Sequence, residues 1–107
     1  ITTNQTFTAT AEVIRYLGAT PVLVDCDANT LCVDFDQVEQ KITDRTKAVI
    51  VVHFAGHAVD LKPLAKVTRK RGIFILEDAA HALPSRIGNR LVGNTGADAS
   101  CFSFYAN

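Results

Sequence analysis

The amino-acid sequence predicts an α/β fold in which helices cover both faces of a mainly parallel sheet. Residues 48–52 and 73–76 are uninterrupted apolar runs of strand length, a pattern typical of strands buried on both faces. Segments with helical spacing alternate with these strands, and the connections between them are short. This order is typical of parallel strand–helix–strand units with right-handed crossovers. Residues 1–107 contain no linker, repeat or low-complexity tract, so we expect a single domain without an internal boundary.

The N-terminal half predicts two helices and a strand. Residues 6–17 predict a helix whose apolar residues recur at spacings of three and four and would face the core: Phe7, Ala11, Ile14 and Leu17. Gly18 is expected to end this helix, because glycine tolerates the left-handed backbone of a helix end. Residues 21–24 predict a short strand. Residues 34–42 predict a second helix, with Asp34 near its positive end.

The C-terminal half begins with residues 48–52, the run that we expect at the centre of the sheet. Asp60 is predicted to cap a helix that has proline in its first turn and ends in a basic run before Gly72. Residues 73–76 form the next predicted strand, and a turn-rich segment leads to a last one at residues 99–105. The alternation of this last strand predicts two faces, one with Cys101, Ser103 and Tyr105 and the other with Phe102 and Phe104, whose burial would anchor it.

The composition argues against several classes of partner. The 11 basic and 11 acidic side chains cancel to a formal net charge of 0, and no basic face stands out, so nucleic acid is not expected to bind. No apolar stretch approaches the roughly 20 residues that span a bilayer, and the first residues lack the layout of a signal peptide. We therefore expect a cytoplasmic protein that has no membrane or nucleic-acid partner.

Cysteine and histidine spacing argues against a metal site. The cysteines are odd in number and lack Cys-x-x-Cys spacing, which predicts reduced thiols at Cys26, Cys32 and Cys101. His53 and His57 have the spacing of a metal pair on a helix, but His53 follows a predicted strand and Gly56 intervenes. The glycines of the turn-rich segment match neither a dinucleotide fingerprint nor a phosphate-binding loop.

Chemistry is expected where the strand at residues 73–76 ends, because ligands reach an open α/β sheet at the carboxyl ends of its strands. Asp78 would lie there with a partly desolvated carboxylate, which needs a cationic or hydrogen-bonding partner to stay ionised. A protonated heterocyclic nitrogen would be such a partner, and a helix cap or an ordinary loop contact is the alternative. His81 would either face the same ligand or be satisfied within the turn.

Several short motifs extend over essentially the whole chain: Thr6-Phe7-Thr8-Ala9-Thr10-Ala11, Gly18-Ala19-Thr20-Pro21-Val22 with Val24-Asp25, Thr46-Lys47-Ala48, His53-Phe54-Ala55-Gly56, Glu77-Asp78-Ala79-Ala80-His81-Ala82 and Phe102-Ser103-Phe104-Tyr105. In this order they resemble the DegT/StrS-type sugar aminotransferases, which are pyridoxal-phosphate enzymes of aspartate-aminotransferase-like fold. The resemblance implies that residues 1–107 are part of the large, cofactor-binding domain of such an enzyme.

The resemblance also implies a role for individual residues toward pyridoxal 5'-phosphate. Asp78 would pair with the pyridinium nitrogen and keep the ring protonated, so that the ring can act as an electron sink. Phe7 would lie against the ring, and His81 would lie near the ring and its phenolic oxygen. Ser103 would donate a hydrogen bond to the cofactor phosphate.

The Schiff-base lysine of such enzymes is expected outside this sequence. By the same resemblance it comes shortly after the serine, at the position directly following Asn107. Part of the phosphate-binding segment is expected before Ile1. The sequence also begins with isoleucine rather than methionine. We therefore expect a fragment that does not turn over by itself.

The activity implied by the resemblance is transfer of an amino group, with glutamate as the expected donor, to a keto sugar linked to a nucleotide. The full-length enzyme would be a homodimer. Dehydratases of the same family carry histidine in place of the lysine and are one alternative; a non-catalytic α/β binding or assembly module is another. The residue after Asn107 would separate these three alternatives, with lysine, histidine or neither.

Overall fold

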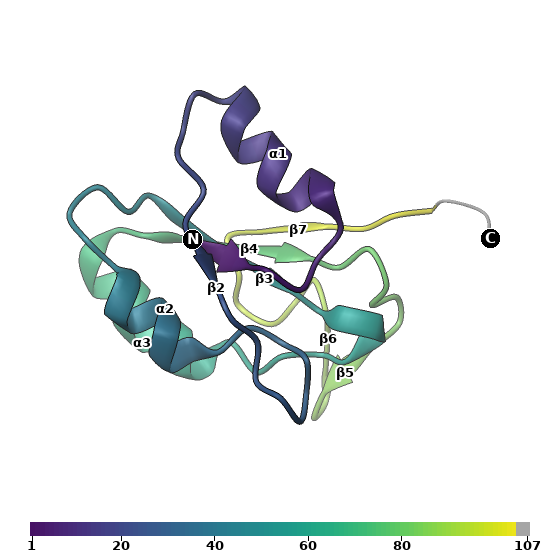
Figure 1. Ribbon diagram of the computed structural model, residues 1–107. Helices are drawn as coiled ribbons and strands as arrows, with labels where there is room; N and C mark the ends of the chain where they lie inside the picture. The colour runs from purple at the N-terminus through teal and green to yellow at the C-terminus, as the bar shows by residue number, and fades with distance from the viewer. Residues whose placement is uncertain (105–107) are drawn as a thin grey trace.

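The computed structural model describes residues 1–104 and confirms the predicted α/β fold (Figure 1). Its strands are β1 (Thr2–Thr3), β2 (Leu23–Val24), β3 (Ala48–Val52), β4 (Phe74–Asp78), β5 (Arg86–Ile87), β6 (Arg90–Leu91) and β7 (Ala99–Cys101). Its helices are α1 (Thr8–Tyr16), α2 (Phe35–Lys41) and α3 (Lys62–Thr68), with short 3-10 turns η1 (Phe54–Gly56) and η2 (Arg69–Arg71).

One parallel sheet organises the chain. Its strand order is β2-β1-β3-β4-β7, so β3 is central, as predicted. Every neighbouring pair in this sheet is parallel, whereas β5 and β6 form a separate antiparallel hairpin. One face of the inner strands is fully buried, since Val49 and Val51 of β3 and Ile75 of β4 are at most 1% exposed. The prediction that both faces are buried along the whole strand is not met at the start of β4, where Phe74 is 60% exposed.

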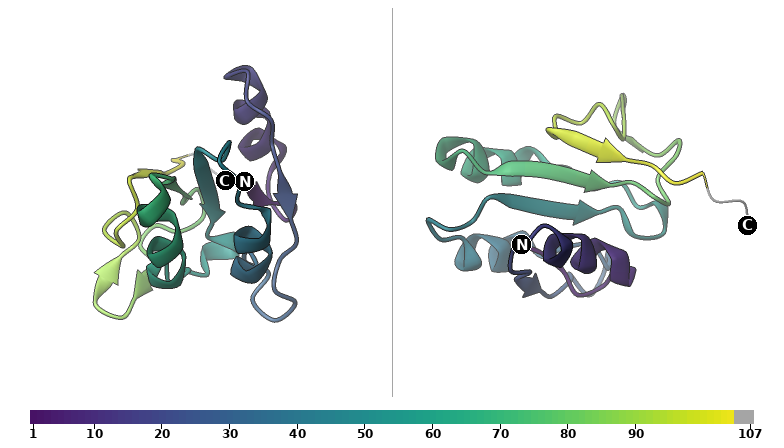
Figure 2. Two further views of the ribbon diagram at one scale, coloured as in Figure 1. Left: turned by 90° about the vertical axis from the view of Figure 1, so that its left-hand side faces the viewer. Right: turned by 90° about the horizontal axis from the view of Figure 1, so that it is seen from above.

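Helices lie on both sides of this sheet, as the sequence predicts (Figures 1 and 2). α2 and α3 lie side by side on one side. Asp34 is the N-cap of α2, as predicted, whereas the N-cap of α3 is Leu61, one residue after the predicted Asp60. Asp34 Oδ1 accepts hydrogen bonds from the backbone N–H of Asp36 at 2.9 Å and of Gln37 at 3.2 Å. Asp60 Oδ1 accepts one from Lys62 N at 3.1 Å. Gly72 follows α3 and η2 with a φ of 64°, the left-handed conformation expected of a residue that ends a helix.

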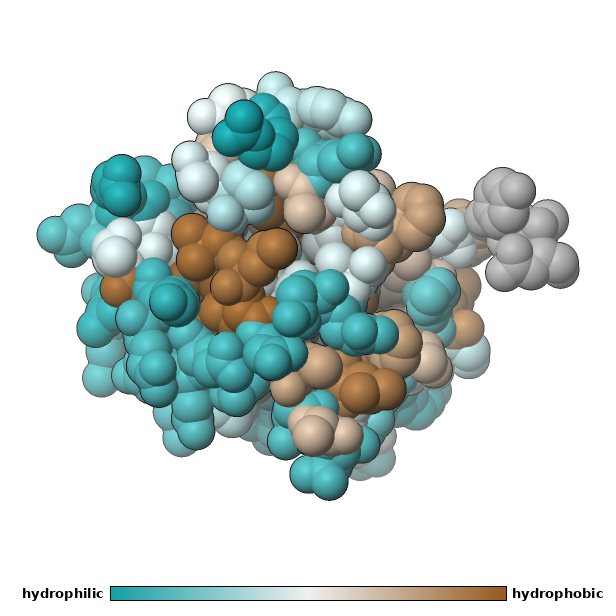
Figure 3. Space-filling model, viewed as in Figure 1, coloured by the Kyte–Doolittle hydropathy of each residue, from teal (hydrophilic) through white to brown (hydrophobic). Residues whose placement is uncertain are grey.

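α1 differs from the prediction in what it buries. The apolar stripe was expected to face the core, but Phe7 is 81% and Leu17 86% exposed, and Thr10 is the buried residue of the helix. Figure 2 shows the reason, since α1 rises away from the sheet and only its beginning lies close to the strands. Figure 3 shows apolar surface between α1 and the α2–α3 pair.

The ends of the sheet also differ from the prediction. β1 was not predicted, because it has only two polar residues, yet Thr2 and Thr3 are 0% exposed between β2 and β3. The last strand ends at Cys101, which leaves residues 102–104 irregular. Phe102 packs beside the cluster of Ala79, Ala82 and Val92, whereas Phe104 is 82% exposed and anchors nothing within residues 1–104. Tyr105, Ala106 and Asn107 lie outside the described residues.

Cys26, Cys32 and Cys101 are free thiols, as their number and spacing predict. Within residues 1–104, none of the helices is both long enough and apolar enough to cross a bilayer.

Candidate active site at the carboxyl edge of the sheet

The strand connections reverse direction beside β1. From β1 the chain crosses through α1 to β2 on one side, and from β2 it returns through α2 to β3 on the other side. Such a reversal opens a crevice at the carboxyl ends of parallel strands, where ligands of α/β proteins bind. The ends of β1, β3, β4 and β7 meet at this edge because these strands are parallel.

Asp78 lies at this edge as the last residue of β4. The strand was predicted to end at Leu76, but pairing continues on both sides through Asp78. Its carbonyl accepts a hydrogen bond from His53 N at 3.1 Å, and Cys101 carbonyl accepts one from Ala79 N at 2.8 Å. The backbone of Asp78 is thus held between β3 and β7 and does not belong to a loop.

Thr10 and Ala80 donate to the Asp78 carboxylate. The Thr10 hydroxyl donates to Oδ2 at 2.7 Å, and the backbone N–H of Ala80 donates to Oδ1 at 3.3 Å. Each carboxylate oxygen has two lone pairs, so each keeps one acceptor position for a further donor. The sequence did not single out Thr10, because a threonine on a helix gives no sign that it will meet a residue 68 positions later.

Phe7 begins the helix that carries Thr10. It is the residue before α1, and its carbonyl accepts a hydrogen bond from Thr10 N at 3.1 Å. The Phe7 ring is exposed. Phe7 and Asp78 are therefore joined through Thr10, although they belong to different elements, and the role of the ring toward a cofactor stays a prediction.

His81 lies in the turn after β4 with an exposed side chain, between the buried residues Ala79 and Ala82. This turn packs closely against η1. A Cβ at Gly56 would lie 3.0 Å from the His81 carbonyl oxygen, and Gly56 has a φ of +81°, so a side chain there is excluded by both space and backbone. Ser85 Oγ donates to the Gly56 carbonyl at 2.7 Å and closes the contact.

Ser103 lies two residues past Cys101, the partner of Asp78 in the sheet register, and so belongs to the same edge. Its side chain is exposed. The structure thus brings Asp78 and Ser103 to one edge of the sheet and links the segment of Phe7 to it. The roles of Phe7, Asp78, His81 and Ser103 remain predictions.

Glu77 carries a second polar cluster, which the sequence did not predict. It is 1% exposed and accepts hydrogen bonds from His53 Nε2 at 3.1 Å, from Gly93 N at 3.1 Å and from the hydroxyls of Thr95 and Ser100. Burial alone would raise the pKa of Glu77, but the hydrogen bonds from His53, Ser100 and Thr95 outweigh it and lower that pKa from 4.5 to about 2.

His53 is engaged fully in this cluster. Its Nδ1 accepts a hydrogen bond from Val59 N at 3.0 Å, so the ring proton is on Nε2 and faces Glu77. Both ring nitrogens of His53 are therefore used within the protein, and His57 is exposed. Residues 1–104 contain no group of three or more histidine, cysteine, aspartate or glutamate side chains arranged to hold a metal ion.

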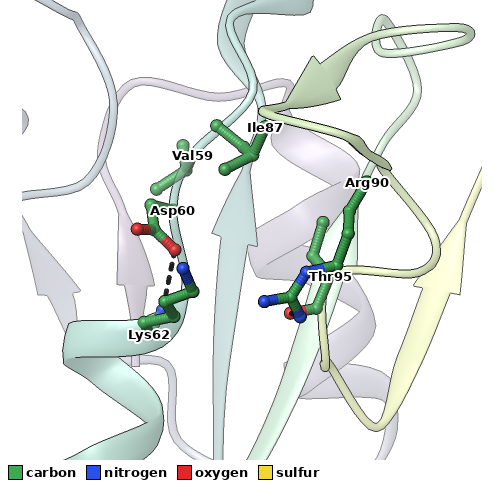
Figure 4. Close-up of a pocket in the computed structure, with 6 residues that line it drawn as sticks. All are labelled: Val59, Asp60, Lys62, Ile87, Arg90 and Thr95. Carbon is green, nitrogen blue, oxygen red and sulfur yellow. Dashed lines mark hydrogen bonds between the residues drawn. The ribbon is translucent and has the colours of Figure 1, made fainter.

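A small hollow reaches Thr95, one of the donors of this buried cluster (Figure 4). It is lined by Val59, Asp60, Lys62, Ile87, Arg90 and Thr95. None of the predicted site residues lines it. The Asp60 carboxylate turns toward the first turn of α3, where it accepts a hydrogen bond from Lys62 N.

Comparisons with known proteins show which family the chain resembles in sequence and fold. A curated relative, the spore coat polysaccharide biosynthesis protein SpsC of Bacillus subtilis, is 47% identical over 106 residues, which are 99% of this chain and 27% of that protein. Among solved structures, a sugar aminotransferase from Streptococcus pneumoniae, Spr1654, matches with a TM-score of 0.91 and 38% identity over 98% of this chain and 30% of its own. That protein has been solved in apo, PLP and PMP forms.

A third match is the structure of DesI in the presence of its TDP-sugar product, with a TM-score of 0.89 and 39% identity over 97% of this chain and 26% of that one. The chain thus spans between a quarter and a third of the length of these relatives. The family model for the DegT/DnrJ/EryC1/StrS aminotransferases matches residues 1–107, and the chain belongs to the DegT/DnrJ/EryC1/StrS aminotransferase family.

Proposed function

We propose that the full-length protein containing this chain is a pyridoxal-phosphate-dependent aminotransferase. It would move an amino group, with glutamate as the donor, to a keto sugar linked to a nucleotide. The observation that carries this proposal is Asp78, an anchored carboxylate at the end of an inner strand with acceptor positions left for a ligand. The TDP-sugar product of DesI supports a nucleotide-linked substrate.

The residues at the carboxyl edge fit this cofactor. A carboxylate held by two donors can still accept from a pyridinium N–H, the exposed Phe7 ring offers an apolar face, and the Ser103 hydroxyl can donate to a phosphate oxygen. When bound, the protonated ring withdraws the electrons of the substrate carbanion that forms on loss of the α-proton.

Each residue has a separate task in this proposal. Asp78 holds a proton at the ring nitrogen by its negative charge, and Phe7 orients the ring by contact with its face. His81, in the turn after β4, would lie near the cofactor ring and the phenolic oxygen of that ring. Ser103 helps to fix the phosphate and so the position of the ring. Residues 1–107 would form part of the large domain, and segments elsewhere in the protein would supply the lysine and the sugar contacts.

Replacing Asp78 in the full-length protein tests this function. Asp78→Asn keeps the shape of the side chain but removes the charge, so transamination should fall by roughly a hundredfold or more while some cofactor binding remains. Asp78→Ala should be at least as damaging. The matched control is Asp44→Asn, an exposed carboxylate in the turn before β3, which should leave the rate unchanged. Near-normal turnover of Asp78→Asn with a nucleotide-linked keto sugar would remove Asp78 from the mechanism.

The compartment and the oligomeric state are part of the same proposal. Free thiols at Cys26, Cys32 and Cys101 support a reducing compartment such as the cytoplasm. We expect the full-length enzyme to be a homodimer, which sedimentation of the purified protein would check.

A further inference from the structure

Thr10 is the one buried residue of a helix that otherwise rises away from the sheet. It is 6% exposed, and its hydroxyl donates to Asp78 Oδ2 at 2.7 Å. A short hydrogen bond from a buried hydroxyl to a carboxylate fixes the rotation of that carboxylate, because turning it would leave the hydroxyl without an acceptor. The contact joins the beginning of α1 to the end of β4.

Thr6 completes this contact from the preceding turn. The Thr6 and Thr10 hydroxyl oxygens lie 2.8 Å apart. Because the Thr10 hydroxyl donates its proton to Asp78, Thr6 must be the donor in this pair. The Thr10 hydroxyl therefore accepts from Thr6 and donates to the Asp78 carboxylate. Two hydroxyls in series thus aim at one oxygen of Asp78.

We propose that Thr10 is a positioning residue for Asp78, and that Thr6 supports it. Thr10 holds Oδ2 so that the carboxylate presents its remaining lone pairs in a fixed direction at the carboxyl edge. Since Phe7 lies one turn before Thr10, the same hydrogen bond sets the place of the Phe7 backbone relative to Asp78. This inference rests on the proposed function, in which Asp78 faces the ring nitrogen of pyridoxal phosphate.

The test uses the full-length protein and a pair of substitutions at one position. Thr10→Val keeps the branched shape and removes the hydroxyl, whereas Thr10→Ser keeps the hydroxyl. Thr8→Val is the control, since Thr8 is an exposed threonine of the same helix. Loss of a hydrogen bond to a charged group predicts a fall in kcat of about 10- to 100-fold for Thr10→Val, with Thr10→Ser within about threefold of wild type.

A spectroscopic measurement separates positioning from packing. Protein reconstituted with pyridoxal phosphate labelled with ¹⁵N in the ring reports the hydrogen bond at that nitrogen by its chemical shift. Thr10→Val should change this shift and its pH dependence, Thr10→Ser should restore the wild-type values, and Thr8→Val should have no effect. A substitution that only loosened the packing would lower the melting temperature but would not change the ¹⁵N chemical shift in Thr10→Val and restore it in Thr10→Ser.

The outcomes distinguish the two proposals. A wild-type protein that does not take up pyridoxal phosphate would overturn the proposed function and this inference with it. Uptake by the wild type, with an unaltered ¹⁵N signal and rate in Thr10→Val, would overturn the inference alone. Equal damage in Thr10→Ser and Thr10→Val would also overturn it, because the methyl group rather than the hydroxyl would then be the important part of Thr10.

Discussion

Two neighbouring acids of β4 have opposite surroundings. Side chains alternate between the faces of a strand, so Glu77 and Asp78 point to opposite sides of the sheet. Glu77 is buried and its four donors come from His53, Gly93, Thr95 and Ser100. Asp78 accepts from fewer donors at the edge. Glu77 is therefore suited to hold the fold together, and Asp78 is suited to receive a ligand.

Ser100 and Ser103 offer a matched comparison of these two tasks. In the full-length protein, Ser103→Ala should raise the dissociation constant of pyridoxal phosphate by about 10- to 150-fold, because a charge-assisted hydrogen bond is worth roughly 1.5–3 kcal/mol. The melting temperature of the apoprotein should hardly change. Cofactor titration and apo melting curves measure the two effects.

Ser100→Ala should show the reverse. Its hydroxyl donates to the buried carboxylate of Glu77, so its removal should lower apo stability by about 1–3 kcal/mol with little change in cofactor affinity. If Ser103→Ala lowered the melting temperature strongly and left the affinity unchanged, Ser103 would be structural and its predicted role would be wrong.

At the scale of elements, the sequence predicts best what depends on local pattern. β3 and β4 follow from continuous apolar runs, and α2 begins at the aspartate that a helix end needs, whereas the N-cap of α3 is one residue after the predicted Asp60. The missed features depend on contacts distant in sequence. Thr2 and Thr3 form a strand only because β2 and β3 pair with them, and nothing local to Thr10 reveals Asp78. The strand pattern and the family resemblance together predicted that Asp78 lies at the carboxyl edge. Neither predicted that Thr10 donates a hydrogen bond to it.

The Glu77 cluster joins β4 to β7 and to the segment that precedes β7, through Gly93 and Thr95. The stability that this cluster contributes should depend on pH. The pKa of Glu77 in the folded protein, about 2, lies below its ordinary value of 4.5. The stability that the ionised form contributes is therefore fully present above about pH 4.5 and is lost as the pH falls from there toward 2. Unfolding by urea at a series of pH values measures this loss.

Glu77→Gln identifies the group responsible. At neutral pH it should lower the free energy of unfolding by about 1–3 kcal/mol, because an amide cannot accept from every donor of the cluster. Below pH 4.5 the difference from wild type should shrink, because the unfolded wild-type protein then takes up a proton on Glu77 and the free energy of unfolding falls. Glu39→Gln, on the exposed side of α2, is the control. A difference that stayed constant from pH 7 to pH 3 would show that Glu77 is not the titrating group.

At the scale of the whole molecule, burial is uneven. The core is made by the inner strands with α2 and α3, and includes Val38, Val49 and Ile75 at no more than 1% exposure. α1 shares little of this core and leaves Tyr16 77% and Leu17 86% exposed. Its link to the sheet is polar, through Thr10 and Asp78. The relatives are more than three times as long as this chain, so we expect other segments of the full-length protein to cover α1.

Amide hydrogen exchange should reveal this difference. In the 107-residue chain, the amides of α1 should exchange well before those of β3 and β4, because few apolar contacts oppose local opening of the helix. In the full-length protein α1 should become protected, since burial of Leu17 and Tyr16 would then oppose opening. Thr10→Val should speed exchange in α1 further and leave β3 unchanged. Protection of α1 equal to that of β4 in the 107-residue chain would mean that the hydrogen bond to Asp78 alone is enough to hold the helix in place.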